Sequence, residues 1–414
     1  MPCRRPGPLH GRHDGGLKRL KKKTLRDIDV AGKRVLVRVD YNVPQADDGS
    51  VADNTRIRET LPTVRYLQHA GCRIVLVSHL GRPNGRLDPT LSLEPVAREL
   101  ERLLGAPVAF AHDAIGPDAR DRAAALAPGG VLLLENVRFH PEEEANDPAF
   151  AAELAKLGDV FVNDAFGTAH RAHASTAGVA AHLPAVAGLL MERELDALGS
   201  VLENPRRPLA AVIGGAKVSS KIAVLENLLP RVDALLVGGG MACTFLKAQG
   251  LEVGRSLVED DRVPFAAQLL RNAEDRGARV LLPLDGVCAE KIDDDSPLVM
   301  VDVHNMPEAM MMLDIGPKTV ESFGTEISQV KTILWNGPMG VFETERFAAG
   351  TKAIADAITG SGATTVVGGG DTVAAIERFS DPARFTHVST GGGASLEFLE
   401  GRTLPGVAAL EDKN

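Results

Sequence analysis

Short runs of β-branched and apolar residues alternate with Ala-, Leu- and Glu-rich stretches from Lys33 to the end of the chain. This alternation is typical of parallel sheets whose strands are joined by crossover helices. Ten strands are expected, at 34–40, 73–79, 130–136, 159–164, 209–215, 234–240, 279–285, 332–338, 364–370 and 385–390. Because ten strands are too many for one compact sheet of this kind, the sequence predicts an α/β fold with two Rossmann-like domains.

The joint between the two domains is expected at the sequence NPRRP, residues 204–208, where two prolines end a helical pattern. With 414 residues the chain is long enough for two domains of ordinary size. We therefore expect a first domain at 22–203 and a second at 204–400, joined by a hinge helix across a cleft. Residues 1–21 are rich in Lys, Arg, Gly and Pro, and we interpret them as a disordered or spurious extension.

The composition excludes several classes of protein. A net charge of −9 argues against a general nucleic-acid binder, and one Trp with two Tyr offers few surfaces for stacking bases. No apolar run approaches the ~20 residues that a membrane span requires. The four cysteines show no metal-binding spacing, which indicates reduced thiols and no zinc site. We expect a cytoplasmic protein with no nucleic-acid or membrane partner.

In the first half, basic side chains follow the predicted strands. Ligands of open α/β sheets bind at the carboxyl ends of strands, so these side chains should gather at one mouth. They are His79, Arg82, Arg138, His170, Arg171 and His173, with Arg56 as a further member. A single such residue would be an ordinary surface group, but together they would repel one another without a polyanion. The histidines are expected to be imidazolium partners of phosphate rather than metal ligands.

In the second half, glycines follow the strands, in the sequences GGAKVSSK, GGGMA, NGPMGVFE, GGGDT and STGGGAS. A glycine corner lets backbone N–H groups approach phosphate oxygens, and the following helix adds the positive end of its dipole. Lys217 and Lys221 are four residues apart, so they are expected on one helical face. Asp371 fits a Mg²⁺ ligand or an ordinary N-cap, and Glu343 fits a ribose contact or a solvated acid.

Two nucleotide fingerprints are absent. The pattern G-x-x-x-x-G-K-[ST] does not occur, and G-x-G-x-x-G/A fails at Gly238 and at Gly368. The alternatives that remain beside a phosphate-handling enzyme are an NAD-dependent dehydrogenase and a catalytically silent nucleotide-binding scaffold. The failed fingerprint weighs against the first, and the Arg/His mouth weighs against the second.

The sequences RVLVRVDYNVP, SHLGRP, LLENVRF, NDAFGTAHRAHAS, GGAKVSSK, LDIGPKT, WNGPMGVFE, GGGDT and STGGGASLE occur in this order. On these motifs the chain resembles the phosphoglycerate kinases from about Lys22 to its C-terminus. The resemblance implies a two-lobed, hinge-bending glycolytic kinase that moves a phosphoryl group between 1,3-bisphosphoglycerate and ADP, giving 3-phosphoglycerate and ATP, with Mg²⁺. It also implies a monomer whose residues 401–414 pack back on the first domain.

Site residues follow from the resemblance, motif by motif. Those implied for 3-phosphoglycerate are Asp40, Asn42, Arg56, His79, Arg82, Arg138 and Arg171. Those implied for the nucleotide are Lys217, Lys221, Met312, Asn336, Glu343, Gly369, Gly370, Asp371 and Thr372, with Asp371 holding the metal. For the transfer itself we expect Arg56, Lys217 and Lys221 to grip the moving group, with the N–H groups around Gly392 and Gly393 aimed at its charge.

Three positions depart from the family pattern. Tyr41 stands where Phe is common, and Ser220 replaces a frequent Asp between the two lysines. Met312 stands near the expected adenine site where Gly or Ala is frequent, so it would narrow the base pocket and alter nucleotide preference.

Overall fold

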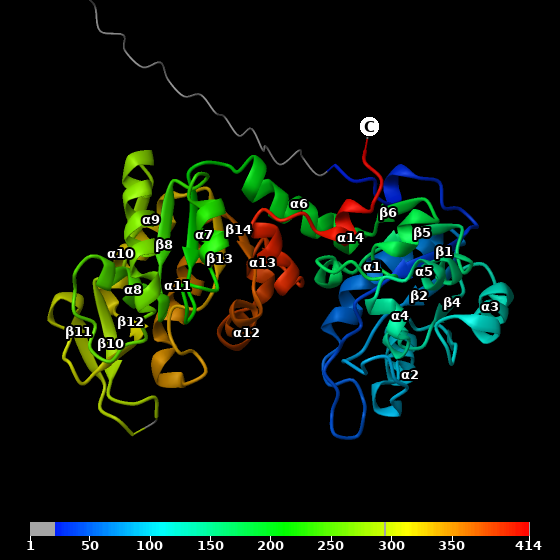
Figure 1. Ribbon diagram of the computed structural model, residues 1–414, viewed down its shortest axis with the longest axis horizontal. Helices are drawn as coiled ribbons and strands as arrows, with labels where there is room; N and C mark the ends of the chain where they lie inside the picture. Colours follow the sequence, from blue (N-terminus) through cyan, green and yellow to red (C-terminus); the bar gives the residue numbers. More distant parts are fainter. Residues whose placement is uncertain (1–20, 294, 414) are drawn as a thin grey trace, which may run out of the picture.

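A computed structural model of the protein describes residues 21–293 and 295–413. The chain forms two lobes, with α6 (Leu189–Glu203) between them (Figure 1). The predicted extension at 1–21 lies outside the described residues except for Lys21, and Cys3 lies there too. Cys72, Cys243 and Cys288 are buried free thiols.

The first lobe is built on a six-stranded sheet in the order β3-β4-β2-β1-β5-β6, in which every pair of neighbours is parallel. Its strands are β1 (Arg34–Arg38), β2 (Arg73–Val77), β3 (Val108–Phe110), β4 (Val131–Leu133), β5 (Val160–Asn163) and β6 (Ala185–Ala187). Its helices are α1 (Thr55–His69), α2 (Glu94–Leu104), α3 (Gly116–Ala125), α4 (Pro141–Glu144) and α5 (Pro148–Ala155). Buried apolar clusters lie on both faces of the sheet, which explains why its strands are continuously apolar.

The second lobe has a parallel six-stranded sheet in the order β15-β14-β13-β7-β8-β9. Its strands are β7 (Leu209–Ile213), β8 (Ala234–Val237), β9 (Arg279–Leu281), β13 (Thr332–Asn336), β14 (Thr364–Val367) and β15 (His387–Val388). Its helices are α7 (Ile222–Leu228), α8 (Met241–Ala248), α9 (Val263–Arg276), α10 (Pro317–Gln329), α11 (Ala349–Gly360), α12 (Gly370–Phe379) and α13 (Gly393–Leu399).

A three-stranded antiparallel sheet extends the second lobe and was not predicted. It has the order β11-β10-β12 and contains β10 (Asp285–Ala289), β11 (Val299–Asp302) and β12 (Met311–Ile315). The sequence predicts one strand over 279–285, but β9 ends at Leu281, two residues before Pro283, and β10 begins at Asp285. Proline has no N–H to continue a sheet ladder, so the single predicted strand is wrong at this point.

A strand of the parallel sheets lies within each of the ten predicted ranges, although the one at 279–285 is shorter than predicted, and the prediction of two mostly parallel sheets flanked by helices is confirmed. The strands missed in the parallel sheets, β3 and β6, are three residues long and partly made of alanine, which has low strand propensity. Within the described ranges, no helix has the length and apolar character that a bilayer span would need.

The chain returns to the first lobe after α13. Around α14 (Pro405–Ala408), the Gly406 N–H donates to the carbonyl of Ala169, and Asn163 donates to the carbonyl of Gly406. The Lys23 N–H donates to Glu411, whose own N–H donates to Ala185. Figure 1 shows this red segment lying against β6. The C-terminal residues thus complete the lobe that the N-terminal residues begin.

Candidate active site

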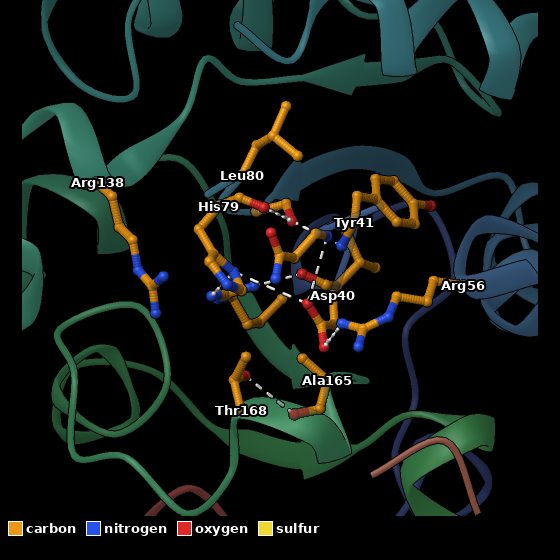
Figure 2. Close-up of polar contacts among 12 residues, drawn as sticks. Asp40, Tyr41, Arg56, His79, Leu80, Arg138, Ala165 and Thr168 are labelled. Carbon is orange, nitrogen blue, oxygen red and sulfur yellow. Dashed lines mark hydrogen bonds and ion pairs between the residues drawn. The ribbon is translucent and has the colours of Figure 1, made fainter. Parts of the chain in front are cut away.

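The carboxyl ends of β1, β2 and β5 bring polar side chains together on the first lobe (Figure 2). Arg56, in the first turn of α1, donates from Nη1 to Oδ2 of Asp40 at 2.6 Å. Asn42 accepts from the Gly81 N–H at 2.9 Å. These contacts place residues from three separate motifs on one surface, which we call the basic mouth and define as Asp40, Asn42, Arg56, His79, Arg82, Arg138, His170, Arg171 and His173.

Arg138 offers donors that no residue satisfies. The side chain is buried, and its Nη1 donates to the carbonyl of Gly81 at 2.8 Å. Its Nη2 has no hydrogen-bond partner among the described residues, and its Nε lies 3.2 Å from Glu144 without a well-directed hydrogen bond. Burial lowers the pKa of Arg138 to about 10, so the charge remains at neutral pH. A buried cation with free donors is suited to an anionic ligand.

The histidines of the basic mouth all have pKa values below the ordinary one, which favours neutral imidazoles over the expected imidazolium groups. Burial, aided by neighbouring arginines, lowers the pKa of His79 well below its ordinary value. Burial lowers the pKa of His173 to about 4 and also lowers that of His170. Several fixed guanidinium charges at close range make a further positive charge unfavourable. These imidazoles are therefore neutral hydrogen-bonding groups.

Two other members lie at the rim of the mouth. Arg82 is exposed on the loop that follows β2, and Arg171 is partly exposed after η4 (Phe166–Thr168). The Nε of Arg171 donates to Nε2 of His170 at 3.1 Å. No group of three or more His, Cys, Asp or Glu side chains suited to a metal ion occurs among residues 21–293 and 295–413.

Two buried charged residues near the mouth were missed by the sequence analysis. Arg38 is fully buried and donates from Nε to Ser175 at 2.8 Å, while its Nη2 lies 3.1 Å from Nδ1 of His79. Glu143 is also fully buried and accepts from the Ser175 hydroxyl at 2.6 Å and from its N–H at 2.8 Å. The signal in the sequence for Arg38 is its charge within the apolar strand run RVLVRVD.

The glycine corners of the second lobe follow β7, β8, β13, β14 and β15, which are parallel neighbours. They therefore lie along one edge of the sheet. One pocket there is lined by Gly215, Ala216, Lys217, Ser220, Lys221, Gly337, Gly369, Gly370, Asp371, Thr372 and Leu396. Gly369 has φ +96°, and a Cβ at that position would lie 2.6 Å from Nδ2 of Asn336. Glycine is required here by both backbone conformation and space. We call this the glycine pocket.

Lys217 and Lys221 do not share a helical face, so that expectation is wrong. Both precede α7, which begins at Ile222, and Lys221 is its N-cap residue. The positive φ of Gly215, +107°, and the turn closed by the Lys221 N–H on Val218 delay the helix. The two lysines nevertheless line the same pocket, and Lys221 contacts Oδ1 of Asn336. Burial lowers the pKa of Lys221.

Asp371 and Thr372 differ in exposure and in hydrogen bonding. Asp371 is exposed in the first turn of α12, whose N-cap is Gly369, so the N-cap alternative is wrong. Thr372 is buried, and its hydroxyl donates to Gly368 at 3.0 Å and accepts from Gly337 at 2.7 Å. The Asp371 carboxylate is thus available to bind a cation beside the lysines. Thr372 connects two glycine corners through its hydrogen bonds to Gly337 and Gly368.

A second, more apolar pocket adjoins the first, and we call it the base pocket. Its lining includes Gly239, Leu257, Ile292, Met312, Pro338, Val341 and Glu343, and it shares Gly215, Ala216 and Asp371 with the glycine pocket. Met312 is buried, whereas Glu343 is exposed at the rim. Ser220, the second departure from the family pattern, donates to the Lys217 carbonyl at 2.8 Å. An apolar pocket beside a glycine-lined one fits a base joined to phosphates.

The two lobes meet at the corner STGGGAS. Thr390 lines a small cavity together with Asp40 and Arg56. Gly391 lies so close to Phe166 that a Cβ would be 2.5 Å from its ring. On α6, the buried carboxylate of Glu194 accepts from His387 at 2.9 Å, Ser389 at 2.7 Å and the Thr390 N–H at 2.8 Å. Gly392, the N-cap of α13, and Gly393, its first residue, thus lie beside the first lobe.

The chain is similar to known proteins over nearly all of its length. A family model described as phosphoglycerate kinase matches residues 25–402. The phosphoglycerate kinase of Chloroflexus aurantiacus is 60% identical over 398 residues, covering 95% of this chain and 100% of that protein. The chain belongs to the phosphoglycerate kinase family.

Two further phosphoglycerate kinases are similar to this chain in sequence or in structure. That of Moorella thermoacetica is 56% identical over 394 residues, covering 95% of this chain and all of the relative. The solved structure of phosphoglycerate kinase from Coxiella burnetii has a TM-score of 0.87 at 42% identity, covering 94% of this chain and 98% of that one. The protein is therefore a glycolytic kinase, and neither the dehydrogenase nor the scaffold alternative is supported.

Proposed function

We propose that the enzyme moves a phosphoryl group reversibly between 1,3-bisphosphoglycerate and ADP, giving 3-phosphoglycerate and ATP. The observation that carries this proposal is the small cavity shared by Asp40, Arg56 and Thr390. It joins the basic mouth of one lobe to the last glycine corner of the other. A donor bound in one lobe and an acceptor bound in the other can be aligned only at such a junction.

The basic mouth is assigned to 3-phosphoglycerate. Arg82, Arg138 and Arg171 would bind its phosphate, because guanidinium groups match phosphate oxygens in charge and geometry. The free Nη2 of Arg138 supports this role. Asp40 and Asn42 would hold the hydroxyl and carboxylate end, with His79 as a neutral donor.

The glycine pocket is assigned to the nucleotide phosphates and the base pocket to the nucleoside. Lys217, Lys221 and the N–H groups at Gly369 and Gly370 would contact the phosphates. Asn336 would position Lys221, Met312 would pack near the base, and Glu343 would accept from the ribose. Thr372 would act mainly by fixing the corners at Gly337 and Gly368, because its hydroxyl is already engaged with both.

Asp371 fits a Mg²⁺ ligand, because Mg²⁺ is held by one or two carboxylates together with substrate phosphates. It is an exposed carboxylate on the wall of the glycine pocket. When bound, the ion would neutralise charge on the phosphate oxygens. The chain itself supplies the two lysines for the same purpose.

The transfer step needs alignment and charge stabilisation rather than a general base. The carboxylate of 3-phosphoglycerate is already an anion, so no proton has to be removed before its oxygen bonds to the γ-phosphorus of ATP and the bond to the ADP oxygen breaks. Arg56 from the first lobe and Lys217 and Lys221 from the second would stabilise the charge on the moving group. The N–H groups at Gly392 and Gly393 would add donors on the same side.

Closure of the two lobes would bring the substrates in line and exclude water. We assign the lobes to residues 22–203 and 204–400, with 401–414 packed on the first. The hinge would include α6, whose Glu194 holds the segment at 387–390 through four hydrogen bonds. We further propose that the enzyme works as a cytoplasmic monomer.

The proposal is tested by following ATP consumption with 3-phosphoglycerate and Mg²⁺ in a coupled assay. Consumption should depend on both substrates and disappear when 3-phosphoglycerate is replaced by glycerate. An Arg138→Met variant should lose affinity for 3-phosphoglycerate in calorimetry while keeping its affinity for ADP. ATP consumption independent of 3-phosphoglycerate would contradict the proposal.

A further inference from the structure

Arg38 is a buried cation that contacts the substrate surface only through another residue. It ends β1 and is 0% exposed. Its Nε donates to Ser175 at 2.8 Å, its Nη1 donates to the carbonyl of Val39, and its Nη2 lies 3.1 Å from Nδ1 of His79. All three guanidinium nitrogens are therefore engaged inside the lobe.

The contact with His79 determines which ring nitrogen carries the proton. A guanidinium group can only donate, so Nδ1 of His79 must accept with its lone pair. The pKa of His79 lies well below its ordinary value because of burial and the nearby arginines, so the ring is neutral and its single N–H is at Nε2. The basic mouth then receives an N–H donor, which an anionic substrate requires.

Asp40 would favour the other tautomer of His79, with the proton on Nδ1. Its Oδ1 lies 3.9 Å from the same Nδ1 of His79, and a carboxylate there accepts from an N–H. If Arg38 were absent, Asp40 would draw the ring proton to Nδ1, and Nε2 would present a lone pair to the anion. The second oxygen of Asp40 is occupied by Arg56 at 2.6 Å, so this carboxylate is already fixed near the ring.

Arg38 is itself held in place by residues in the interior of the lobe. The Ser175 hydroxyl that accepts from its Nε donates to the buried carboxylate of Glu143 at 2.6 Å. A buried guanidinium without such support would be strongly destabilising, and Glu143 provides the nearby negative charge. The chain Glu143, Ser175, Arg38 and His79 is a continuous series of hydrogen bonds from the lobe interior to the mouth.

We propose that Arg38 is a positioning residue that holds His79 as its Nε2–H tautomer, so that the neutral imidazole donates a hydrogen bond to the bound anion. This inference rests on the proposed binding of 3-phosphoglycerate at the basic mouth. It assigns a role to a residue that does not itself touch the substrate.

The tautomer can be observed without substrate. Long-range proton–nitrogen NMR spectra of selectively labelled protein should show a protonated Nε2 and an unprotonated Nδ1 in His79 of the wild type. In Arg38→Met the proton should move to Nδ1. A wild-type His79 protonated at Nδ1, or an Arg38→Met variant with unchanged tautomer, would overturn the inference.

Kinetics provide the second readout. Arg38→Met should raise the KM for 3-phosphoglycerate about tenfold, the scale of one hydrogen bond to a charged group, and leave the KM for ATP unchanged. Arg38→Lys should recover part of this loss because Lys also only donates. The matched control is Arg34→Met, at the opposite end of β1, where neither KM should change. Equal rises in both KM values would contradict a positioning role.

If Arg38→Met does not fold, Arg38→Gln tests the same contact with His79, because a Gln amide keeps a polar side chain in the buried site and its oxygen can accept from an N–H at Nδ1. It should move part of the His79 population to the Nδ1–H tautomer, and an unshifted population would overturn the inference. Failure of the proposed function is distinguishable, because it would appear as a wild-type enzyme inactive towards 3-phosphoglycerate whatever tautomer His79 adopts.

Discussion

The two lobes offer different parts of the chain to the charged molecules that we propose they bind. The first lobe offers side chains, since Arg138 is buried with unsatisfied donors and Arg38 contacts His79 from inside the lobe. The second lobe offers backbone at glycine corners, together with Lys217 and Lys221. Side-chain sites depend on the identity and support of each residue, whereas backbone sites depend on conformation and space. The lobes should therefore respond to different kinds of substitution.

The largest effect is expected from the first lobe. Arg56→Ala should lower kcat on the order of 10²-fold or more, the cost of removing one donor to the transition state. The coupled 3-phosphoglycerate and ATP assay measures this. Arg98→Ala is the control, because Arg98 is an exposed residue of α2 paired with Glu94. Near-full turnover of Arg56→Ala would remove this residue from the transfer step.

The next largest effect is expected from a buried carboxylate, because the two lobes surround such groups differently. Glu143 faces arginines, but Asp314, beneath the base pocket, accepts from the N–H groups of Gly350 and Ile315. Burial raises the pKa of Asp314 to about 7. A folded-state pKa above that of the unfolded chain means that the native state prefers the protonated carboxyl, so this residue costs stability progressively from about pH 4 to about pH 7.

Asp314→Asn should therefore gain stability relative to the wild type, on the order of 2 kcal/mol, as pH rises through this window. Urea unfolding at about pH 5, 6, 7 and 8 measures the difference, which should be constant above about pH 8. The exposed Asp48→Asn is the control. A difference that does not vary with pH would show that Asp314 is ionised without cost.

Adding one methyl group to a glycine corner should impair the backbone site of the second lobe without affecting the side-chain site of the first. Gly369→Ala should raise the nucleotide KM about tenfold, because the added Cβ strains a residue with φ +96° and displaces Asn336. The KM for 3-phosphoglycerate should not change. Gly360→Ala is the control, since nothing lies within 4 Å of a Cβ added there. Equal changes in the two KM values would mean that the lobes are not separable in this way.

The smallest effect is expected in the base pocket. Met312→Ala should increase the use of GDP relative to ADP by about threefold, because it widens the pocket while removing an adaptable side chain. The ratio of kcat/KM values for the two nucleotides measures this. Met310→Ala, outside the pocket lining, is the matched control. An unchanged ratio would show that Met312 does not limit the base.

The sequence predicted the parallel sheets well because their strands are continuous apolar runs, such as 209–213, buried on both faces. It did not predict β10–β12, since DGVCA and MMLDI lack both a clear alternation and a turn signal. It placed Lys217 and Lys221 on a helix because residue spacing does not reveal the positive φ of Gly215. It missed Arg38 because a charge within a strand usually points to solvent, and only tertiary packing shows that this one is buried.

The return of the C-terminal segment has a consequence for synthesis of the protein. Glu411 bonds to Ala185 and Lys23, and Gly406 bonds to Ala169, so the first lobe contains partners from both ends of the chain. On a ribosome, the residues that make the glycine pocket are all available before those last partners emerge. The lobe translated first is therefore the lobe finished last.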